Sequence, residues 1–330
     1  MKHYKSHNQQ LKILRTRGLV VPTNGQPKKF LEQENYYNVI NGYKDLFLEK
    51  GVDDTPVIPE RYLQNTHFDE LKSLFLFDRE LRILFLKYIL IFENSFKTVL
   101  SHEFSKKYKK QNSYLEIQNY NNNNPKKVLQ QISILTKTIH DKVDKSGAVK
   151  HYIEDYGYVP LWVLVNYLTI GNLAYLYDIL KDEDKNTIAQ YYSIKFEKQY
   201  RNTPTLVLSS EDLGSALKII NLVRNKCAHD ERLYNSNFGN IRSANISNYF
   251  EFTNYDNRKI IVAILYLKVL LDEKYFKNFY SELKYIFNKY QNEFHLYVFF
   301  HCCCYVNLVN DSIKQSINDS FANMDDNLPF

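Results

Sequence analysis

Much of the chain places hydrophobic residues three and four positions apart, which is the spacing of an amphipathic helix. The most apolar stretch runs from Phe68 to about Phe104 and predicts one long helix or two in tandem. Residues 30–47 predict a helix broken near Gly42. Further helices are expected at residues 8–17, 128–139, 160–180, 183–200, 209–234 and 259–272, with an aromatic helix around 294–305. We therefore expect an all-α fold with additional helices at both ends of a helical bundle.

Local signals indicate where some helices begin and end. Residues 209–212, Ser-Ser-Glu-Asp, have the Ser-x-x-acid pattern that caps a helix N-terminus. Gly18 is expected to end the first helix. Gly171, inside a predicted helix, indicates either a close approach or a break. Trp162 lies in an apolar segment and is expected in the core.

The composition narrows the fold class further. Only 9 Gly and 8 Pro among 330 residues argue against a β-sandwich or barrel, which needs many tight turns. Hydrophobic residues make up 44% and charged residues 24%, so disordered and fibrous classes are excluded. The pattern predicts an N-terminal helical segment (1–67), a helical core (68–240) and a C-terminal helical extension (241–330).

Charge and cysteine content set limits on partners. The net charge of +6, from 43 Lys and Arg against 37 Asp and Glu, permits a polyanionic partner without requiring one. The four cysteines are Cys227 and a consecutive run at residues 302–304. They lack the spacing of a zinc knuckle, so no metal site and no cofactor are expected. The apolar runs are shorter than the ~20 residues that cross a bilayer, and no apolar signal segment follows Met1. We expect a cytoplasmic protein that does not use a membrane.

The candidate chemistry lies near the end of a predicted helix, at Arg224, Asn225 and His229. A neutral imidazole can take the proton of a ribose 2′-OH, and a guanidinium can stabilise the charge that grows on the phosphate, so the pair suits RNA cleavage without a metal. Arg224 falls in line with the apolar stripe, where its charge is costly unless paired. His229 lies about 140° round the helix from Arg224, so a shared site needs a composite arrangement or a distorted helix end.

The bare spacing is common, because Arg61 and His67 match it as well. From the residues alone, other roles stay open: Arg224 in a buried ion pair, Asn225 as a polar cap at a fraying helix end, and His229 on the surface.

Several short sequence segments strengthen the case for a catalytic site at Arg224, Asn225 and His229. They occur in order at residues 10–21 (QLKILRTRGLVV), 35–37 (NYY) with 42–43 (GY), 77–82 (FDRELR), 160–162 (PLW) with Gly171, and 224–235 (RNKCAHDERLYN). Together they resemble the Abi-like proteins of bacterial abortive infection against phage, the AbiD/AbiF group. The resemblance covers residues 8 to 236, roughly seven-tenths of the chain.

The resemblance implies a helical bundle of the HEPN superfamily, whose R-x4-6-H motif forms a metal-independent endoribonuclease site. Arg224, Asn225 and His229 match that motif position for position. Two such motifs usually meet at a dimer interface, so one motif per chain implies a homodimer. The resemblance also implies an RNA substrate and a structured non-coding RNA as cofactor or antitoxin. Lys97 departs from the pattern, because an Arg is expected in the helix after Glu93.

Other residues are candidates for supporting roles. Glu93 is expected to hold Arg224 or Arg79, or to face solvent. Charged residues at 78–82 are expected to form a charged helix face or ion pairs between helices. A basic run is expected either to bind the phosphate backbone with a ring stacked on a base, or to be a solvated loop: Lys106, Lys107, Tyr108, Lys109 and Lys110.

The predicted function is therefore a toxin or defence protein that cleaves single-stranded or looped RNA by attack of the 2′-OH. The alternative is a non-catalytic module that binds a structured non-coding RNA in a ribonucleoprotein. Neither charge nor periodicity distinguishes between these two hypotheses. A mainly structural protein also stays possible on these grounds.

Overall fold

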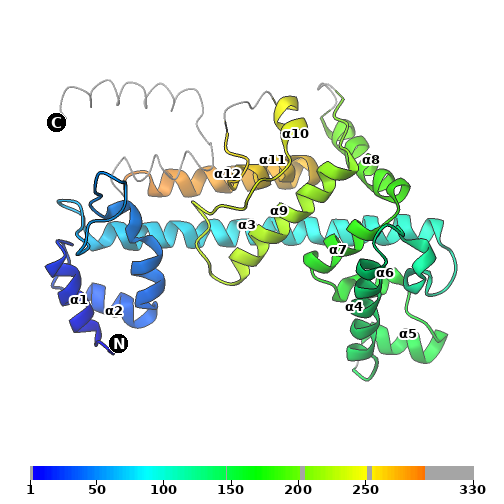
Figure 1. Ribbon diagram of the computed structural model, residues 1–330, viewed down its shortest axis with the longest axis horizontal. Helices are drawn as coiled ribbons and strands as arrows, with labels where there is room; N and C mark the ends of the chain where they lie inside the picture. Colours follow the sequence, from blue (N-terminus) through cyan, green and yellow to red (C-terminus); the bar gives the residue numbers. More distant parts are fainter. Residues whose placement is uncertain (1–2, 146, 201–204, 251–254, 294–330) are drawn as a thin grey trace. The chain divides into compact units, whose positions relative to one another are not determined.

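The computed structural model describes residues 3–145, 147–200, 205–250 and 255–293. Within these ranges the pairing of extended segments is limited to isolated bridges, such as that between Val20 and His67. The α-helices shown in Figure 1 are α1 (His7–Thr16), α2 (Gln26–Gln33), α3 (Phe68–Lys107), α4 (Pro125–Val143), α5 (Ala148–Tyr156), α6 (Leu161–Leu164), α7 (Ile170–Ile179), α8 (Asp182–Gln199), α9 (Ser210–Ala228), α10 (Ala244–Tyr249), α11 (Ile261–Leu270) and α12 (Glu273–Tyr290). The predicted all-α fold is confirmed. No helix in these ranges has both the length and the apolarity needed to cross a bilayer.

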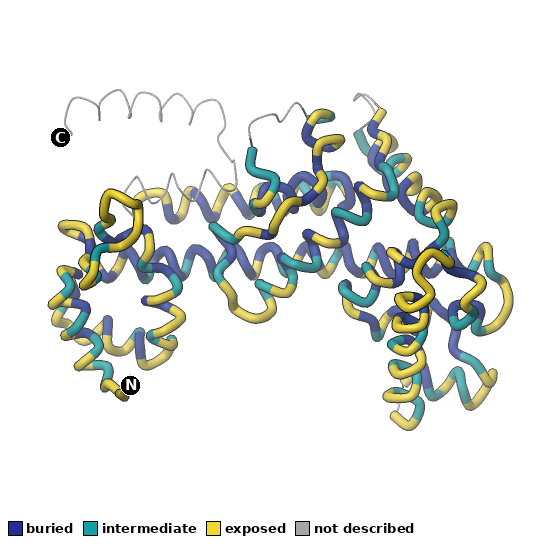
Figure 2. Tube along the Cα trace, viewed as in Figure 1, coloured by how far each residue is buried: buried dark blue, intermediate teal, exposed yellow. Residues whose placement is uncertain are grey.

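Helix α3 is one continuous helix of 40 residues, not two in tandem. Its sequence holds no Gly or Pro that would interrupt the backbone hydrogen bonds. At about 1.5 Å per residue the helix is about 60 Å long. Buried positions recur along its whole length (Figure 2), and many of them are Leu and Phe, so packing as well as propensity stabilises it.

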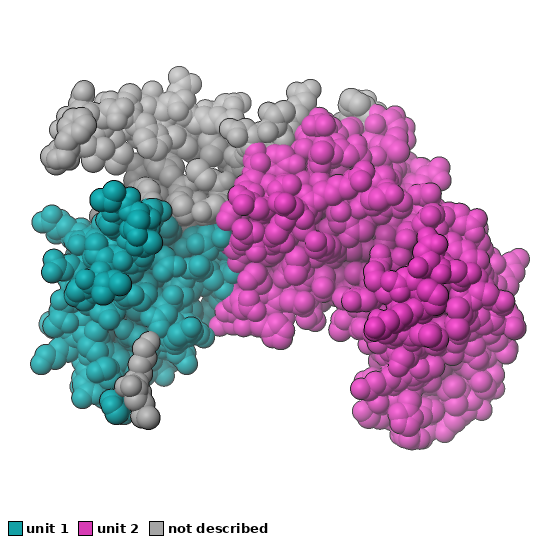
Figure 3. All heavy atoms as spheres, in the orientation of Figure 1, with its two compact units in different colours: residues 1–82, 232–235, 282–330 teal, residues 83–231, 236–281 magenta. Residues whose placement is uncertain are grey.

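The chain forms two compact units, coloured separately in Figure 3. One unit contains residues 1–82, 232–235 and 282–330, and the other contains residues 83–231 and 236–281. The first part of α3 belongs to one unit and the rest to the other. The domain limits at residues 67 and 240 follow the sequence pattern and stay a prediction.

A buried carboxylate organises the first unit. Asp78 accepts hydrogen bonds from the Tyr43 hydroxyl at 2.7 Å, from Arg82 at 2.6 Å, and from the backbone amides of Leu233 and Tyr234 at 2.9 and 2.7 Å. Burial raises the pKa of the Asp78 carboxyl, and Arg82 and these hydrogen bonds oppose the rise. The segment that follows the Arg–His motif is thus fastened to α3 through its backbone.

Packing of helices against one another forms the second unit. Helix α9 contacts α7, α8 and α11, and α7 also contacts α4. Aromatic rings of α3 join them: Phe92 lies 6.2 Å from Tyr192 of α8, and Phe96 lies 6.1 Å from Tyr177 of α7. Since α7 and α9 pack directly together, the surface beside their contact is well defined.

Several sequence predictions need correction. Helix α9 ends at Ala228, not near residue 234, because Asp230 adopts a left-handed conformation (φ 57°) that a helix cannot continue. Trp162 is 51% exposed, so its assignment to the core was wrong. Within residues 30–47, α2 ends early and short π and 3-10 turns follow. The aromatic helix around 294–305 and the cysteines at 302–304 lie outside the described residues.

Candidate functional site

Helix α9 presents two faces of opposite character. Leu213, Leu217 and Ile220 are buried, as the apolar stripe predicts. Ser209 caps the helix by accepting a hydrogen bond from the amide of Asp212, and the Asp212 side chain binds the amide of Ser209 in return. The predicted helix start is therefore confirmed, and the polar face of α9 is turned away from the core.

The C-terminal end of α9 carries the motif. The amide of His229 donates to the carbonyl of Asn225 at 3.0 Å, and the amide of Glu231 donates to the carbonyl of Lys226 at 3.0 Å. With Asp230 left-handed, this is a Schellman arrangement, which closes a helix by satisfying its last carbonyls. Lys226 and Glu231 also form an ion pair at 2.9 Å across the turn. The backbone around His229 is thus held firmly at the helix end.

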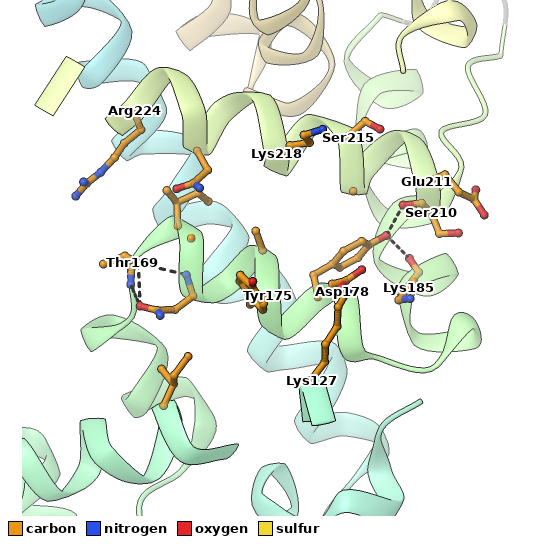
Figure 4. A pocket seen from close by; sticks show the side chains of 18 of the residues that line it. Lys127, Thr169, Tyr175, Asp178, Lys185, Ser210, Glu211, Ser215, Lys218 and Arg224 are labelled. Carbon is orange, nitrogen blue, oxygen red and sulfur yellow. Dashed lines mark hydrogen bonds and ion pairs between the residues drawn. The ribbon is translucent and has the colours of Figure 1, made fainter. Parts of the chain in front are cut away.

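A groove of about 990 Å³ lies along the polar face of α9 and the neighbouring face of α7, with α4 and α8 contributing to its walls. Figure 4 shows Arg224 and Thr169 at one end, and Ser210, Glu211 and Lys185 at the other. The contact between the helices is tightest at Gly171, where a Cβ would lie 3.2 Å from Asn221 Oδ1, whereas a Cβ on Gly214 would lie at an ordinary 3.8 Å from the Tyr177 ring. Gly171 therefore lies at a close contact with α9, and the helix predicted over 160–180 is also broken at residues 165–169, just before Gly171.

Arg224 reaches this groove from the border of the apolar stripe. Its side chain is half-buried and lines the groove, and its Nε atom is buried without a hydrogen-bond partner. Among the described residues we find no carboxylate paired with Arg224. A buried ion pair is therefore not what holds this guanidinium, and a cation without a protein partner is suited to an anion from outside.

The three motif residues are only partly brought together. Asn225 is exposed and lines the same groove as Arg224. His229 is exposed at the helix end and does not line the groove within one chain. This matches the helical geometry, because α9 stays regular to Ala228 and separates the two side chains around its axis.

Glu93 has a different partner from the two considered in the sequence. Its carboxylate accepts from Lys97 at 2.8 Å, one turn further along α3, and its second oxygen is buried without a partner. Arg79 instead pairs with Glu34 at 2.6 Å. Glu93 is thus buried, not solvent-facing, and Lys97 stands where it can neutralise the carboxylate.

The basic run at residues 106–110 is largely occupied by contacts within its own unit. Lys107 forms ion pairs with Glu183 and Asp184 of α8, and Tyr108 donates its hydroxyl to Asp184 at 2.9 Å. Burial lowers the pKa of Lys107, but the hydrogen bonds that its ammonium group donates to these two carboxylates outweigh that effect, and the pKa is raised. Two more ion pairs of the basic run join Lys106 to Glu103 at 3.8 Å and Lys110 to Glu116 at 2.5 Å. The run ties α3 to α8, and its role in RNA binding stays a prediction.

Sequence reasoning missed the other residues of the groove. Lys218 and Asn221 of α9 lie at helical spacing from Asn225, and Tyr175 comes from α7. The spacing on α9 was visible in the sequence, but a polar helix face usually only contacts water. Only the packing of α7 against that face makes it a groove.

The comparisons with known proteins bear on this site. A model of the Abi-like protein family matches residues 29–235, which is more than half of the chain and includes the whole motif. The chain belongs to the Abi-like family. Membership implies a part in abortive infection, the defence by which an infected bacterium limits a phage. Comparison with curated proteins and with solved structures gave no match.

For an Abi-like protein, the surface that deserves a functional test is therefore the groove that carries Arg224 and Asn225. Within the described ranges, no group of three or more His, Cys, Asp or Glu side chains lies close enough together to hold a metal ion.

Proposed function

We propose that this Abi-like protein is an endoribonuclease that cleaves single-stranded or looped RNA during abortive infection, with Arg224, Asn225 and His229 as its catalytic residues. The observation that carries the proposal is the unpaired guanidinium of Arg224 in a groove beside Asn225. A phosphate diester supplies the negative oxygens that this guanidinium lacks among the described residues.

The reaction assigned to these residues is an internal transfer of phosphate. His229 takes the proton of a ribose 2′-OH, and the 2′-oxygen attacks the adjacent phosphorus. The bond from phosphorus to the 5′-oxygen breaks, and that oxygen takes a proton from water as it leaves. Arg224 binds the charged phosphate oxygens and Asn225 orients them. The products are a 2′,3′-cyclic phosphate and a 5′-hydroxyl, and single-stranded sites suit the in-line attack.

The site requires a second copy of the chain in this proposal. Within one chain His229 does not line the groove that holds Arg224. A homodimer in which two motifs face each other places the His229 of one copy beside the Arg224 of the other. Such a site is composite, as the angle of about 140° between the two positions requires.

The first test is expression of the wild-type, His229→Ala and Arg224→Ala chains in a bacterial host, with total RNA analysed in the presence of a chelator. We expect the wild type to stop growth and fragment RNA, and each variant to cleave at least about 100-fold more slowly. His151→Ala is the matched control, because His151 is an exposed histidine of α5 paired with Asp155 at 2.9 Å.

Mixing the two inactive chains tests the composite site. If Arg224 and His229 come from different copies, a mixed dimer of the two variants contains one intact site and regains part of the activity. Cleavage by His229→Ala at the wild-type rate would remove His229 from the mechanism.

A non-catalytic RNA-binding role is the second candidate, with a structured non-coding RNA as its partner. The absence of His229 from the groove lining of one chain favours it. It predicts intact RNA with every chain, and RNA that co-purifies with the wild type but not with Arg224→Ala.

A further inference from the structure

The groove on α7 and α9 has its uncompensated positive charge between its middle and one end. Four cations line it, and two of them are paired: Lys127 with Asp178 at 2.9 Å, and Lys185 with Asp182 at 3.6 Å. Among the described residues, the remaining two have no carboxylate partner: Lys218 and Arg224. Lys218 lies at the middle of α9 and Arg224 in its last two turns (Figure 4), about 9 Å apart along the helix axis.

An unoccupied aromatic ring lies beside these cations. Tyr175 of α7 lines the groove and is 53% exposed, and no ring contact or hydrogen bond engages it among the described residues. Figure 4 shows it between the Arg224 end and the Ser210 end of the groove. An exposed ring with free faces is the type of side chain on which nucleic-acid bases stack.

The packing of α7 and α9 sets the register of these groups. Gly171 lies opposite Asn221, and Tyr177 lies opposite Gly214, so the two helices run antiparallel. Tyr175 is therefore at the level of residues 216–217, within one helical turn of Lys218, and the start of α7 is near the level of Arg224. Small residues between them, including Ala174, leave the groove open.

We propose that this groove is the RNA-binding track of the protein, in which Tyr175 stacks on a base and Lys218 binds the phosphate of a nucleotide next to the one held by Arg224. The inference rests on the proposed function for its ligand class, single-stranded RNA. A strand matches a row of two separated cations and a ring better than one isolated phosphate does, because charge and stacking surface alternate along it. Neither residue takes part in bond breaking, so both determine binding.

The test measures binding apart from cleavage. A short fluorescein-labelled oligoribonucleotide with 2′-O-methyl groups throughout has no 2′-OH to attack, and fluorescence anisotropy with the full-length chain gives its Kd. We expect Tyr175→Ala to weaken binding about 5- to 100-fold and Tyr175→Phe to keep it, because the ring supplies the contact. Lys218→Gln should weaken binding and lower the slope of log Kd against log salt by about one.

Two variants serve as matched controls. Tyr285→Ala removes an exposed tyrosine of α12, and Lys198→Gln removes an exposed lysine of α8, both outside the groove. Neither should change the Kd more than twofold. Circular dichroism establishes that every variant is folded.

The outcomes separate this inference from the proposed function. Binding that depends on Tyr175 and Lys218 in a chain that never cleaves RNA supports the track and refutes the nuclease. Cleavage that depends on His229, with binding indifferent to Tyr175 and Lys218, refutes the track alone. Light scattering after gel filtration covers one more outcome: a Tyr175→Ala chain that changes from two copies to one would make the groove a contact between copies and overturn the inference.

Discussion

Arg224 shows how one residue can serve function at the expense of stability. It lies at the border of the apolar stripe of α9, and its buried Nε has no partner among the described residues. Removing a guanidinium from water without pairing it is unfavourable, and that cost is recovered only when an anion binds. Functional sites often carry such locally unfavourable side chains.

Replacing this guanidinium should therefore stabilise the chain. We expect Arg224→Met, which keeps the length of the side chain without its charge, to raise the free energy of unfolding by about 1 kcal/mol. Urea denaturation followed by circular dichroism measures the change. Arg79→Met is the matched control and should destabilise the protein, because Arg79 is paired with Glu34. Equal losses of stability in the two variants would contradict this account of Arg224.

At the scale of elements, the groove depends on how closely α7 and α9 approach. Gly171 and Gly214 lie at the two places where the helices meet. The sequence indicated a break or a close approach at Gly171, but it could not show that the contact is with Asn221, because Asn221 is 50 residues further along. The distance between these helices therefore depends on residues of both helices and cannot be predicted from the sequence of α7 alone.

A single methyl group tests this spacing. Gly171→Ala puts a Cβ 3.2 Å from Asn221 Oδ1, whereas Gly42→Ala meets nothing within 4 Å. An alanine in a compatible conformation usually gains about 0.4–1 kcal/mol through the unfolded chain. We expect Gly42→Ala to show that gain in thermal unfolding and Gly171→Ala to show none. If Gly171→Ala raises the stability as much as Gly42→Ala does, an added Cβ fits between α7 and α9 without strain.

Other elements show where the sequence was sufficient. Periodicity predicted α3, α4, α8, α9 and α11, and the Ser209 cap predicted the start of α9. It did not predict where α9 ends, because that depends on Asp230 adopting a positive φ, which is rare for residues other than glycine. The partner of Glu93 was also missed. It is Lys97, one turn further along the same helix, and not one of the more distant arginines that the sequence suggested.

For the whole molecule, Asp78 is the residue that joins distant parts of the first unit. It bonds Tyr43, Arg82 and the backbone at Leu233 and Tyr234. The sequence indicated ion pairs at 78–82, and Arg79 and Glu80 do form them, with Glu34 and Lys289. It could not reveal that Asp78 is fully buried, because burial comes from segments far away in the chain.

Loss of this carboxylate should affect the stability of the entire unit. We expect Asp78→Asn to lower the free energy of unfolding by about 3–5 kcal/mol, because it removes the buried carboxylate that pairs with Arg82 at 2.6 Å. The measurement is chemical denaturation of the full-length chain. Glu80→Gln is the control, since its partner Lys289 is partly exposed and such pairs contribute about 0–1 kcal/mol. Similar effects of the two substitutions would show that Asp78 is not the organising residue.

The fastening of residues 233 and 234 also limits which changes in chain length the protein tolerates. The amide of Glu231 is bound to Lys226, and the amide of Leu233 is bound to Asp78, so only Arg232 separates two fixed points of the backbone. An inserted or deleted residue between His229 and Leu233 would break one of the two attachments, whereas the asparagine-rich loop at 121–124 is exposed or half-exposed and can change its length. Insertions and deletions among related proteins should therefore accumulate in that loop and avoid the four residues after the motif histidine.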